Sequence, residues 1–413
     1  MSYLFVFRSY PDIDHMLPLA WKLAERGQQV HAVISPGYDP GTDHRLAFAT
    51  QVSNLHVHRL DSGYRMETLW RTSLPYAMGF MLRHRVRVVA VEWGAGLPVG
   101  YDRLASAAGL VAVARSLVRS VRHRGEAQQV RVNHIVAARL LRRARLCLPH
   151  GLSIKLDRVS SSADIGVDID WSDRNRFTVY VMNTDHHRRW FLEHANGDPD
   201  VVQTWGSLRW SPEWFAINRD LAPDVEWPAP DGAARVVFML PKWHNRVHRE
   251  RVVGLVKRLQ ALDFVSLALK GHPRPAEGSA DPLRADPEVD FGRILDFSTK
   301  DSVGLIRAAD AVIDVGSSIG IETVMQHRAL INPTYVHELT TLFDDIPGSA
   351  VVANDADKVI DSLRACAAGD PPLATPEAYD ELMRRAVFGS RDAPYDVMDH
   401  YYRQVRALTG APD

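Results

Sequence analysis

The feature that most constrains this sequence is an alternation of short apolar runs with amphipathic stretches, which begins twice along the chain. Residues 3–7 and 29–35 are apolar runs, and residues 16–25 between them carry apolar side chains at helical spacing. Strand, helix and strand in this order predict a parallel β-α-β unit. The alternation restarts over residues 235–269. We therefore expect an α/β fold with two doubly wound, Rossmann-like domains.

The boundary between these domains is expected where the alternation stops. Residues 220–232 (DLAPDVEWPAPDG) are rich in proline and acid and lack periodicity, which is typical of a linker. This predicts an N-terminal domain of residues 1–219, a linker of residues 220–234 and a C-terminal domain of residues 235–413.

Composition excludes several classes of protein. The 413 residues carry a net charge of −1, so no global field attracts nucleic acid. Cys147 and Cys366 are too few for a disulfide framework or a cysteine metal site. There is neither a signal-peptide pattern nor an apolar run of about 18 residues. We expect a cytoplasmic protein, with contact to the membrane surface as the alternative.

One local region is strongly basic. Residues 112–146 contain nine arginines and a single acid, Glu126, interleaved with apolar residues. The pattern predicts amphipathic helices with a solvated polar face. The alternative is a surface for anionic lipid headgroups or a polyanionic acceptor.

The stretch AVIDVGSSIGIETVMQ, residues 311–326, combines an apolar strand, a turn and a helix. Gly316 ends the strand, and Ser317 or Ser318 begins the helix, where free backbone N–H groups and the helix dipole favour a phosphate. Glu322 lies one turn further along the same face and could accept bonds from ribose hydroxyls. The stretch is thus compatible with a nucleotide site, or with an ordinary capped helix.

Two further loops follow predicted strands. Residues 8–15 (RSYPDIDH) leave the first strand at its carboxyl end, where α/β sheets place ligands, and they contain Asp14 and His15. A capped helix starting at Asp14 is the alternative. Residues 270–275 (KGHPRP) contain His272 and Pro273. No GxGxxG, GxxxxGK[ST] or HExxH motif is present, which argues against the dehydrogenase, P-loop kinase and zinc protease classes.

The order of these motifs resembles that of bacterial surface-polysaccharide transferases with the GT-B architecture, including the CDP-glycerol glycerophosphotransferases and the sialyl- and polysialyltransferases. The shared features are His272-Pro273 and, later in the same domain, Ser317-Ser318. LPHGLSIKLD (residues 148–157), GSLR (206–209), LPKWHNR (240–246) and residues 309–331 resemble further glycerophosphotransferase segments in family order. The resemblance covers a little under half of the chain.

The sequence departs from the family pattern at several positions. Leu152-Ser153 replaces a threonine-proline pair, Gly316 replaces a tyrosine, and Glu322 replaces an aspartate. These changes leave a nucleotide site in place but put the identity of the transferred group in doubt.

The resemblance implies a GT-B fold with an interdomain cleft and an inverting, metal-independent transferase without a cofactor. Its donor would be CDP- or CMP-activated, carrying glycerol phosphate, another polyol phosphate or a sugar. The acceptor would be a cell-surface glycan, a teichoic-acid-like polymer or a lipid-linked glycan. A UDP-sugar glycosyltransferase or epimerase of the same fold, and a non-catalytic GT-B scaffold, are the alternatives.

The resemblance also implies roles for individual residues. His272 would donate to the leaving phosphate, and Ser317 and Ser318 would hold the nucleotide, with Lys242 and Arg246 as supporting cations. His150 would be the general base, because it follows a strand of the other domain and because histidine as a residue type titrates near neutral pH. Asp14 and His15 are the alternative bases.

Overall fold

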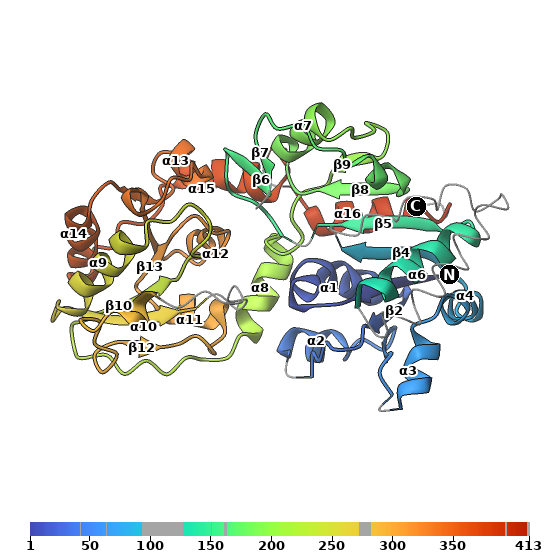
Figure 1. Cartoon of the computed structure of the whole chain (residues 1–413), viewed down its shortest axis with the longest axis horizontal. Helices are drawn as coiled ribbons and strands as arrows, with labels where there is room; N and C mark the ends of the chain where they lie inside the picture. The colour runs from blue at the N-terminus through green and yellow to red at the C-terminus, as the bar shows by residue number, and fades with distance from the viewer. Residues whose placement is uncertain are drawn as a thin grey trace. The chain divides into compact units, whose positions relative to one another are not determined.

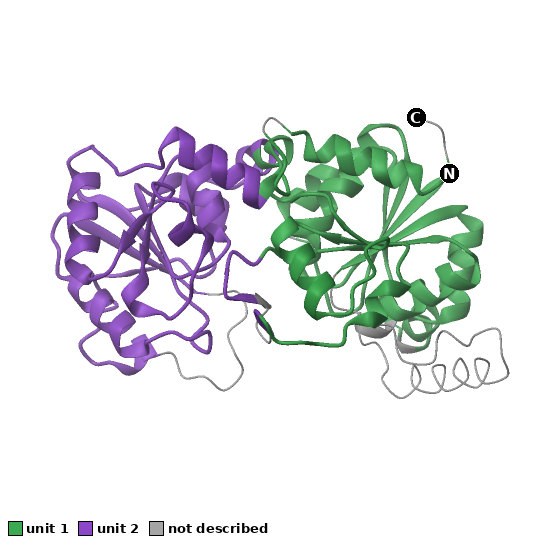
Figure 2. Ribbon diagram, turned by 90° about the horizontal axis from the view of Figure 1, so that it is seen from above, with its two compact units in different colours: residues 1–152, 166–215, 387–413 green, residues 153–165, 216–386 purple. Residues whose placement is uncertain are grey.

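The computed structural model describes residues 1–41, 43–62, 64–92, 127–149, 151–160, 163–271, 282–392 and 395–410. Its two compact units are coloured separately in Figure 2. Unit 1 contains residues 1–152, 166–215 and 387–413, and unit 2 contains residues 153–165 and 216–386. The chain therefore passes between the units at several points, whereas the sequence indicated a single linker over residues 220–234.

Unit 1 is built on a seven-stranded sheet in the order β3-β2-β1-β4-β5-β8-β9, and all of its strand pairs are parallel. The strands are β1 (Ser2–Phe7), β2 (Gln29–Ile34), β3 (Leu55–Arg59), β4 (Val86–Glu92), β5 (Ala144–Leu148), β8 (Val179–Met182) and β9 (Val202–Thr204).

Helices cover both faces of this sheet, as the green unit of Figure 2 shows. They are α1 (Tyr10–Glu25), α2 (His44–Ala49), α3 (Arg65–Arg71), α4 (Leu74–Arg83), α6 (Ala127–Leu140), α7 (Asp185–His194) and α16 (Val397–Ala407), while α8 (Pro212–Leu221) leads into unit 2. All residues of β1 are buried, as expected for a central parallel strand with helices on either side.

Unit 2 repeats the architecture with six strands in the order β12-β11-β10-β13-β14-β15, again all parallel. They are β10 (Ala234–Met239), β11 (Val265–Lys270), β12 (Leu295–Asp296), β13 (Ala311–Asp314), β14 (Ala329–Pro333) and β15 (Val351–Ala353). A small hairpin of β6 (Arg158–Ser160) and β7 (Ala163–Asp164) also belongs to this unit.

The helices of unit 2 pack on both faces of its sheet, shown in purple in Figure 2. They are α9 (Arg249–Gln260), α10 (Pro282–Ala285), α11 (Ser302–Ala308), α12 (Ile319–Met325), α13 (Leu342–Asp345), α14 (Ala356–Ala367) and α15 (Pro376–Leu382). The expected doubly wound α/β fold is thus confirmed for each unit. Among the described residues, no helix is both long enough and apolar enough to cross a membrane.

The C-terminal helix belongs to unit 1, which the sequence did not indicate. In Figure 1, α16 (red) lies beside the strands formed by earlier parts of the chain. The Tyr401 hydroxyl donates a hydrogen bond of 2.9 Å to the carbonyl of Gly206. Gly206 has φ +90°, and an added Cβ would lie 2.6 Å from the Val387 carbonyl, so only glycine allows this close approach.

Two expectations about local structure are wrong. Residues 10–15 form the first turns of α1 instead of a loop, because Ser9 is extended and Pro11 occupies the first turn, where proline is favoured. Arg131, in the basic region, is 1% exposed and pairs with Glu92 in the core instead of facing solvent. Residues 112–126 of that region lie outside the described residues.

Four histidines, His31, His56, His58 and His84, form a histidine cluster in unit 1. His31 Nδ1 and His58 Nε2 are 3.0 Å apart, and the His31 and His84 ring centroids are 4.3 Å apart. Burial, and next the neighbouring His84, lower the pKa of His31 to about 3 and that of His58 to about 4. The imidazoles of His31 and His58 are therefore neutral in the folded chain at pH 7.

The histidine cluster predicts that unit 1 loses stability in acid. As the pH falls below about 6.5, histidines protonate in the unfolded chain first, because their pKa is lowered only in the fold. Each such histidine then costs up to about 1.4 kcal/mol of unfolding free energy per pH unit. His31→Phe should reduce the difference in urea unfolding midpoint between about pH 7.5 and pH 5, whereas His244→Phe, at an exposed position in the loop after β10, should not. Equal pH dependence in wild type and His31→Phe would contradict this.

Candidate functional site

The strand order of unit 2 identifies where a ligand can bind. The order reverses between β10 and β13, whose carboxyl ends, Met239 and Asp314, are register partners. In open parallel sheets, the crevice outside such a reversal is the usual ligand site. The loop after β10 carries Lys242 and Arg246, and the turn after β13 contains residues 316–318. The structure therefore brings two of the sequence-predicted loops to adjacent strand ends.

The turn after β13 favours glycine. Gly316 has φ +65°, and an added Cβ would lie 3.0 Å from Leu339 Cδ1. Ser317 follows it and is exposed, and Ser318 is half-buried and makes no capping bond with its side chain. The tyrosine of the resembled family would be strained at position 316 in this backbone conformation.

Asp314 holds this turn together. Its carboxylate accepts hydrogen bonds from the Ser317 backbone N–H (2.9 Å) and from the Ser317 hydroxyl (2.6 Å). The side chain is buried, and burial raises the pKa of Asp314 to about 7, against the opposing effects of the Ser317 bonds and of Lys155. Sequence reasoning did not single out this residue, although a carboxylate closing an apolar strand was a usable signal.

Cations lie near the same strand ends. Lys155 is half-buried, and burial together with Arg158 and Lys242 lowers its pKa, so these cations are close enough to repel one another. Its segment is bound to unit 2 through hydrogen bonds from Leu156 N–H to the Thr340 carbonyl (2.8 Å) and from Leu342 N–H to the Ile154 carbonyl (2.7 Å). Mutually repelling cations beside a turn that carries two serines favour a polyanion such as a diphosphate.

Two of the predicted binding residues are engaged elsewhere. The Arg246 guanidinium donates to Asp157 (3.1 Å) and Asp164 (3.0 Å), so it ties the β6–β7 hairpin to the loop after β10. Glu322 is 1% exposed, so it offers no carboxylate surface for the expected bond to a ribose. His150, His272 and Pro273 lie outside the described residues.

Unit 1 has a corresponding reversal of strand order between β1 and β4. Arg8 follows β1 and pairs with Glu92 at the end of β4, which also binds Arg131. Asp12 accepts hydrogen bonds from the backbone N–H groups of Arg8 (2.6 Å) and Ser9 (3.1 Å). Burial, followed by the charge of Glu92, raises the pKa of Asp12 to about 7. A buried cluster of ionisable groups thus marks this reversal as well.

The alternative bases in α1 are enclosed. Asp14 is 5% exposed and its carboxylate binds Arg45 and, at 3.1 Å, Arg209. Burial acts to raise its pKa, but the two arginines outweigh burial and lower it. A carboxylate so held is a poor proton acceptor near neutral pH. His15 is 5% exposed and lies edge-on to Trp210, with the two ring centroids 5.8 Å apart.

In the described part of the chain, no three His, Cys, Asp or Glu side chains are arranged to hold a metal ion.

The raised pKa of Asp314 predicts opposite effects for two neighbouring aspartates. Asp314 stays protonated in the fold while it ionises in the unfolded chain, so the wild type loses stability as the pH rises from about 4 to 7. Asp314→Asn should remove this loss and raise the unfolding free energy at pH 8 by roughly 2 kcal/mol. Asp310, whose carboxylate binds Arg235 and whose pKa is lowered, provides the control.

Urea unfolding of both variants at pH 5 and pH 8 measures these effects. Asp310→Asn should destabilise the protein by a similar amount at pH 5 and at pH 8, because both values lie above the ordinary carboxyl pKa of about 3.9 and the lowered pKa in the fold lies below it. Destabilisation by Asp314→Asn at pH 8 equal to that by Asp310→Asn would contradict the account of Asp314.

No protein-family model matches the sequence, and no curated protein shows significant sequence similarity to it. Solved structures do resemble it in fold. A UDP-GlcNAc 2-epimerase from Methanocaldococcus jannaschii in complex with UDP-GlcNAc and UDP superposes with a TM-score of 0.54 at 11% identity, covering 100% of both chains. A glycosyltransferase from Rickettsia africae gives a TM-score of 0.56 at 11% identity, covering 99% of this chain and 97% of the other.

A third similar structure is the HepE protein of Anabaena in complex with UDP and glucose, with a TM-score of 0.54 at 11% identity and coverage of 100% of both chains. At these identities the similarity concerns the fold. Together with the two parallel sheets, it shows that the chain has the GT-B fold.

Proposed function

We propose that this chain is a GT-B enzyme that binds a nucleotide-activated sugar at the carboxyl ends of β10 and β13. The main observation behind the proposal is that the Gly316 turn, Lys155 and Lys242 lie together where the strand order of unit 2 reverses. The similar structures with UDP, UDP-GlcNAc or glucose bound support a UDP-sugar as the donor.

The chemistry of the site suits a diphosphate. Lys155 and Lys242 neutralise its charge, and Ser318 offers a hydroxyl that is not used as a helix cap. Ser317 contributes less directly, because its hydroxyl already donates to Asp314. Ser317→Ala is therefore expected to affect stability as well as binding, whereas Ser318→Ala isolates binding.

Two reactions are compatible with this donor site. The first is epimerisation of a UDP-sugar or transfer of its sugar, as the names of the similar structures suggest. The second is transfer from a CDP- or CMP-activated donor, such as one carrying glycerol phosphate, to a cell-surface glycan. The second is supported by the sequence matches over residues 148–157, 206–209, 240–246 and 309–331.

For transfer, we assign His150 as the base and His272 as the donor to the leaving group. The acceptor hydroxyl loses its proton to His150, its oxygen bonds to the reacting atom of the donor, and the bond to the nucleotide phosphate breaks. The departing phosphate takes the electron pair and a hydrogen bond from His272. No metal is required by this scheme, because the cations and the imidazole supply the positive charge.

A nucleotide panel tests the donor site. UDP at about 100 times its dissociation constant should stabilise the wild type by about 2.7 kcal/mol, with CDP and CMP weaker. Ser318→Ala and Lys242→Met should each weaken nucleotide binding by roughly tenfold or more, since each removes a hydrogen bond to a charged group. Lys257→Met should have no effect, because Lys257 lies near the C-terminal end of α9, which leads into the amino end of β11 and not to the carboxyl ends of the strands.

Thermal-shift titrations with UDP, UDP-sugars, CDP and CMP provide the measurement. Preference for CDP or CMP would favour the second reaction. Absence of binding by every nucleotide would overturn the proposal.

The two histidines are distinguished by what their loss changes. His272→Ala should weaken nucleotide binding and slow the reaction, because His272 acts on the phosphate. His150→Ala should leave nucleotide binding nearly intact and lower kcat by roughly two to four orders of magnitude. Binding titrations and turnover rates on folded variants decide between these roles. Near-normal turnover of His150→Ala would show that the base lies elsewhere.

A further inference from the structure

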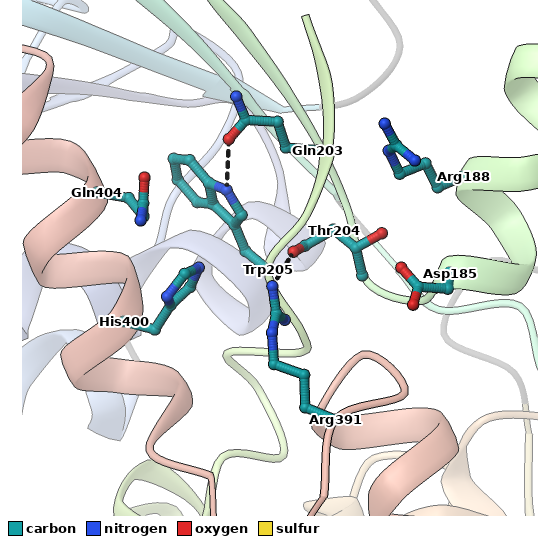
Figure 3. Close-up of a pocket in the computed structure, with 8 residues that line it drawn as sticks. All are labelled: Asp185, Arg188, Gln203, Thr204, Trp205, Arg391, His400 and Gln404. Atoms are coloured by element: carbon teal, nitrogen blue, oxygen red, sulfur yellow. Dashed lines mark hydrogen bonds between the residues drawn. The ribbon is translucent and has the colours of Figure 1, made fainter. Parts of the chain in front are cut away.

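Unit 1 contains a pocket that the nucleotide site does not use. It lies at the carboxyl end of the edge strand β9 and has a volume of about 350 Å³. Figure 3 shows its walls, which come from the first turn of α7, the end of β9, the chain before α16, and α16 itself. The lining side chains are Asp185, Arg188, Gln203, Thr204, Trp205, Arg391, His400 and Gln404.

The charge of this pocket favours a single anion. Arg188 and Arg391 contribute two cations against the one carboxylate of Asp185. His400 adds no charge at neutral pH, because burial and then Arg391 lower its pKa to about 4. The ten-residue helix α7 begins at the pocket, so its free N–H groups add to the positive potential.

Part of the polar lining is already bonded within the protein. Arg391 Nη2 donates to the Thr204 carbonyl at 2.9 Å, and Trp205 Nε1 donates to Gln203 Oε1 at 2.9 Å (Figure 3). Arg188 Nε donates to the Val202 carbonyl at 2.8 Å. These bonds hold the walls in place and orient both guanidinium groups.

Other polar atoms of the lining lack partners. Arg391 Nη1, Thr204 Oγ1 and His400 Nε2 are enclosed, and none has a hydrogen-bond partner among the described residues. Enclosed polar atoms without partners are unfavourable in a folded protein. All three belong to residues that line the pocket, on the side formed by β9, Arg391 and α16.

We propose that this pocket binds a small hydroxylated anion of about the size of a monosaccharide. A carboxylate or phosphate of the ligand pairs with Arg391 and Arg188, and its hydroxyls bond to Gln404 and Asp185. The volume lies at the lower end of the range of about 300–1,000 Å³ for small-molecule sites, which suits one sugar ring. The pocket is a second site, formed by unit 1 alone, and does not depend on the proposed nucleotide site.

Ligand-observed NMR titration of the full chain tests this proposal with three probes: glucuronate, glucose 6-phosphate and glucose. At least one of the two anions should bind, and glucose should bind at least roughly tenfold more weakly, because it lacks the charge-assisted bonds. Binding of glucuronate alone identifies a carboxylate ligand, and binding of glucose 6-phosphate alone identifies a phosphate ligand. Failure of both anions to bind, or equal binding of glucose, would overturn the proposal.

Variants locate the site. Arg391→Gln should weaken binding of the anion by roughly tenfold or more. Gln404→Ala, which breaks no described side-chain hydrogen bond, should weaken binding severalfold without changing the melting temperature.

Two variants serve as controls. Arg403→Gln removes the same charge from an exposed position of α16 and should have no effect. Lys242→Met in unit 2 should also leave this binding intact, which separates the pocket from the nucleotide site. Unchanged affinity in both Arg391→Gln and Gln404→Ala would overturn the assignment.

Discussion

The reversal of strand order beside the first strand of each sheet constrains where this chain can bind a ligand. At β1/β4 and at β10/β13 the connections leave the sheet toward opposite faces, so the carboxyl ends of the strands remain uncovered. Both places collect charged side chains. In unit 2 these are cations beside the Gly316 turn, and in unit 1 they are Arg8 and Glu92.

The two reversals share a further feature: a buried aspartate accepts hydrogen bonds from the segment that follows the strand. Asp12 accepts hydrogen bonds from the backbone of Arg8 and Ser9, and Asp314 accepts them from Ser317. Burial raises the pKa of each to about 7. Burial disfavours the ionised form of each carboxyl group, whereas the hydrogen bonds that it accepts favour the ionised form.

The sequence predicted local structure well and long-range partners poorly. Apolar runs and helical spacing identified most central strands and the strand–turn–helix at residues 311–326, because these follow from local periodicity. The return of α16 to unit 1, the pairing of Arg131 with Glu92 and the burial of Glu322 depend on contacts between distant residues. Periodicity carries no information about such contacts. The helical start of α1 was readable from Ser9 and Pro11, a signal that the ligand-loop interpretation of residues 8–15 overrode.

The central claim is that unit 2 binds a nucleoside diphosphate at the carboxyl ends of β10 and β13. A crystal structure of the full chain with UDP tests this most directly. The account predicts density for the diphosphate against residues 316–318, with Lys155 and Lys242 within hydrogen-bonding distance of its oxygens. Well-defined UDP bound away from these strand ends would contradict it.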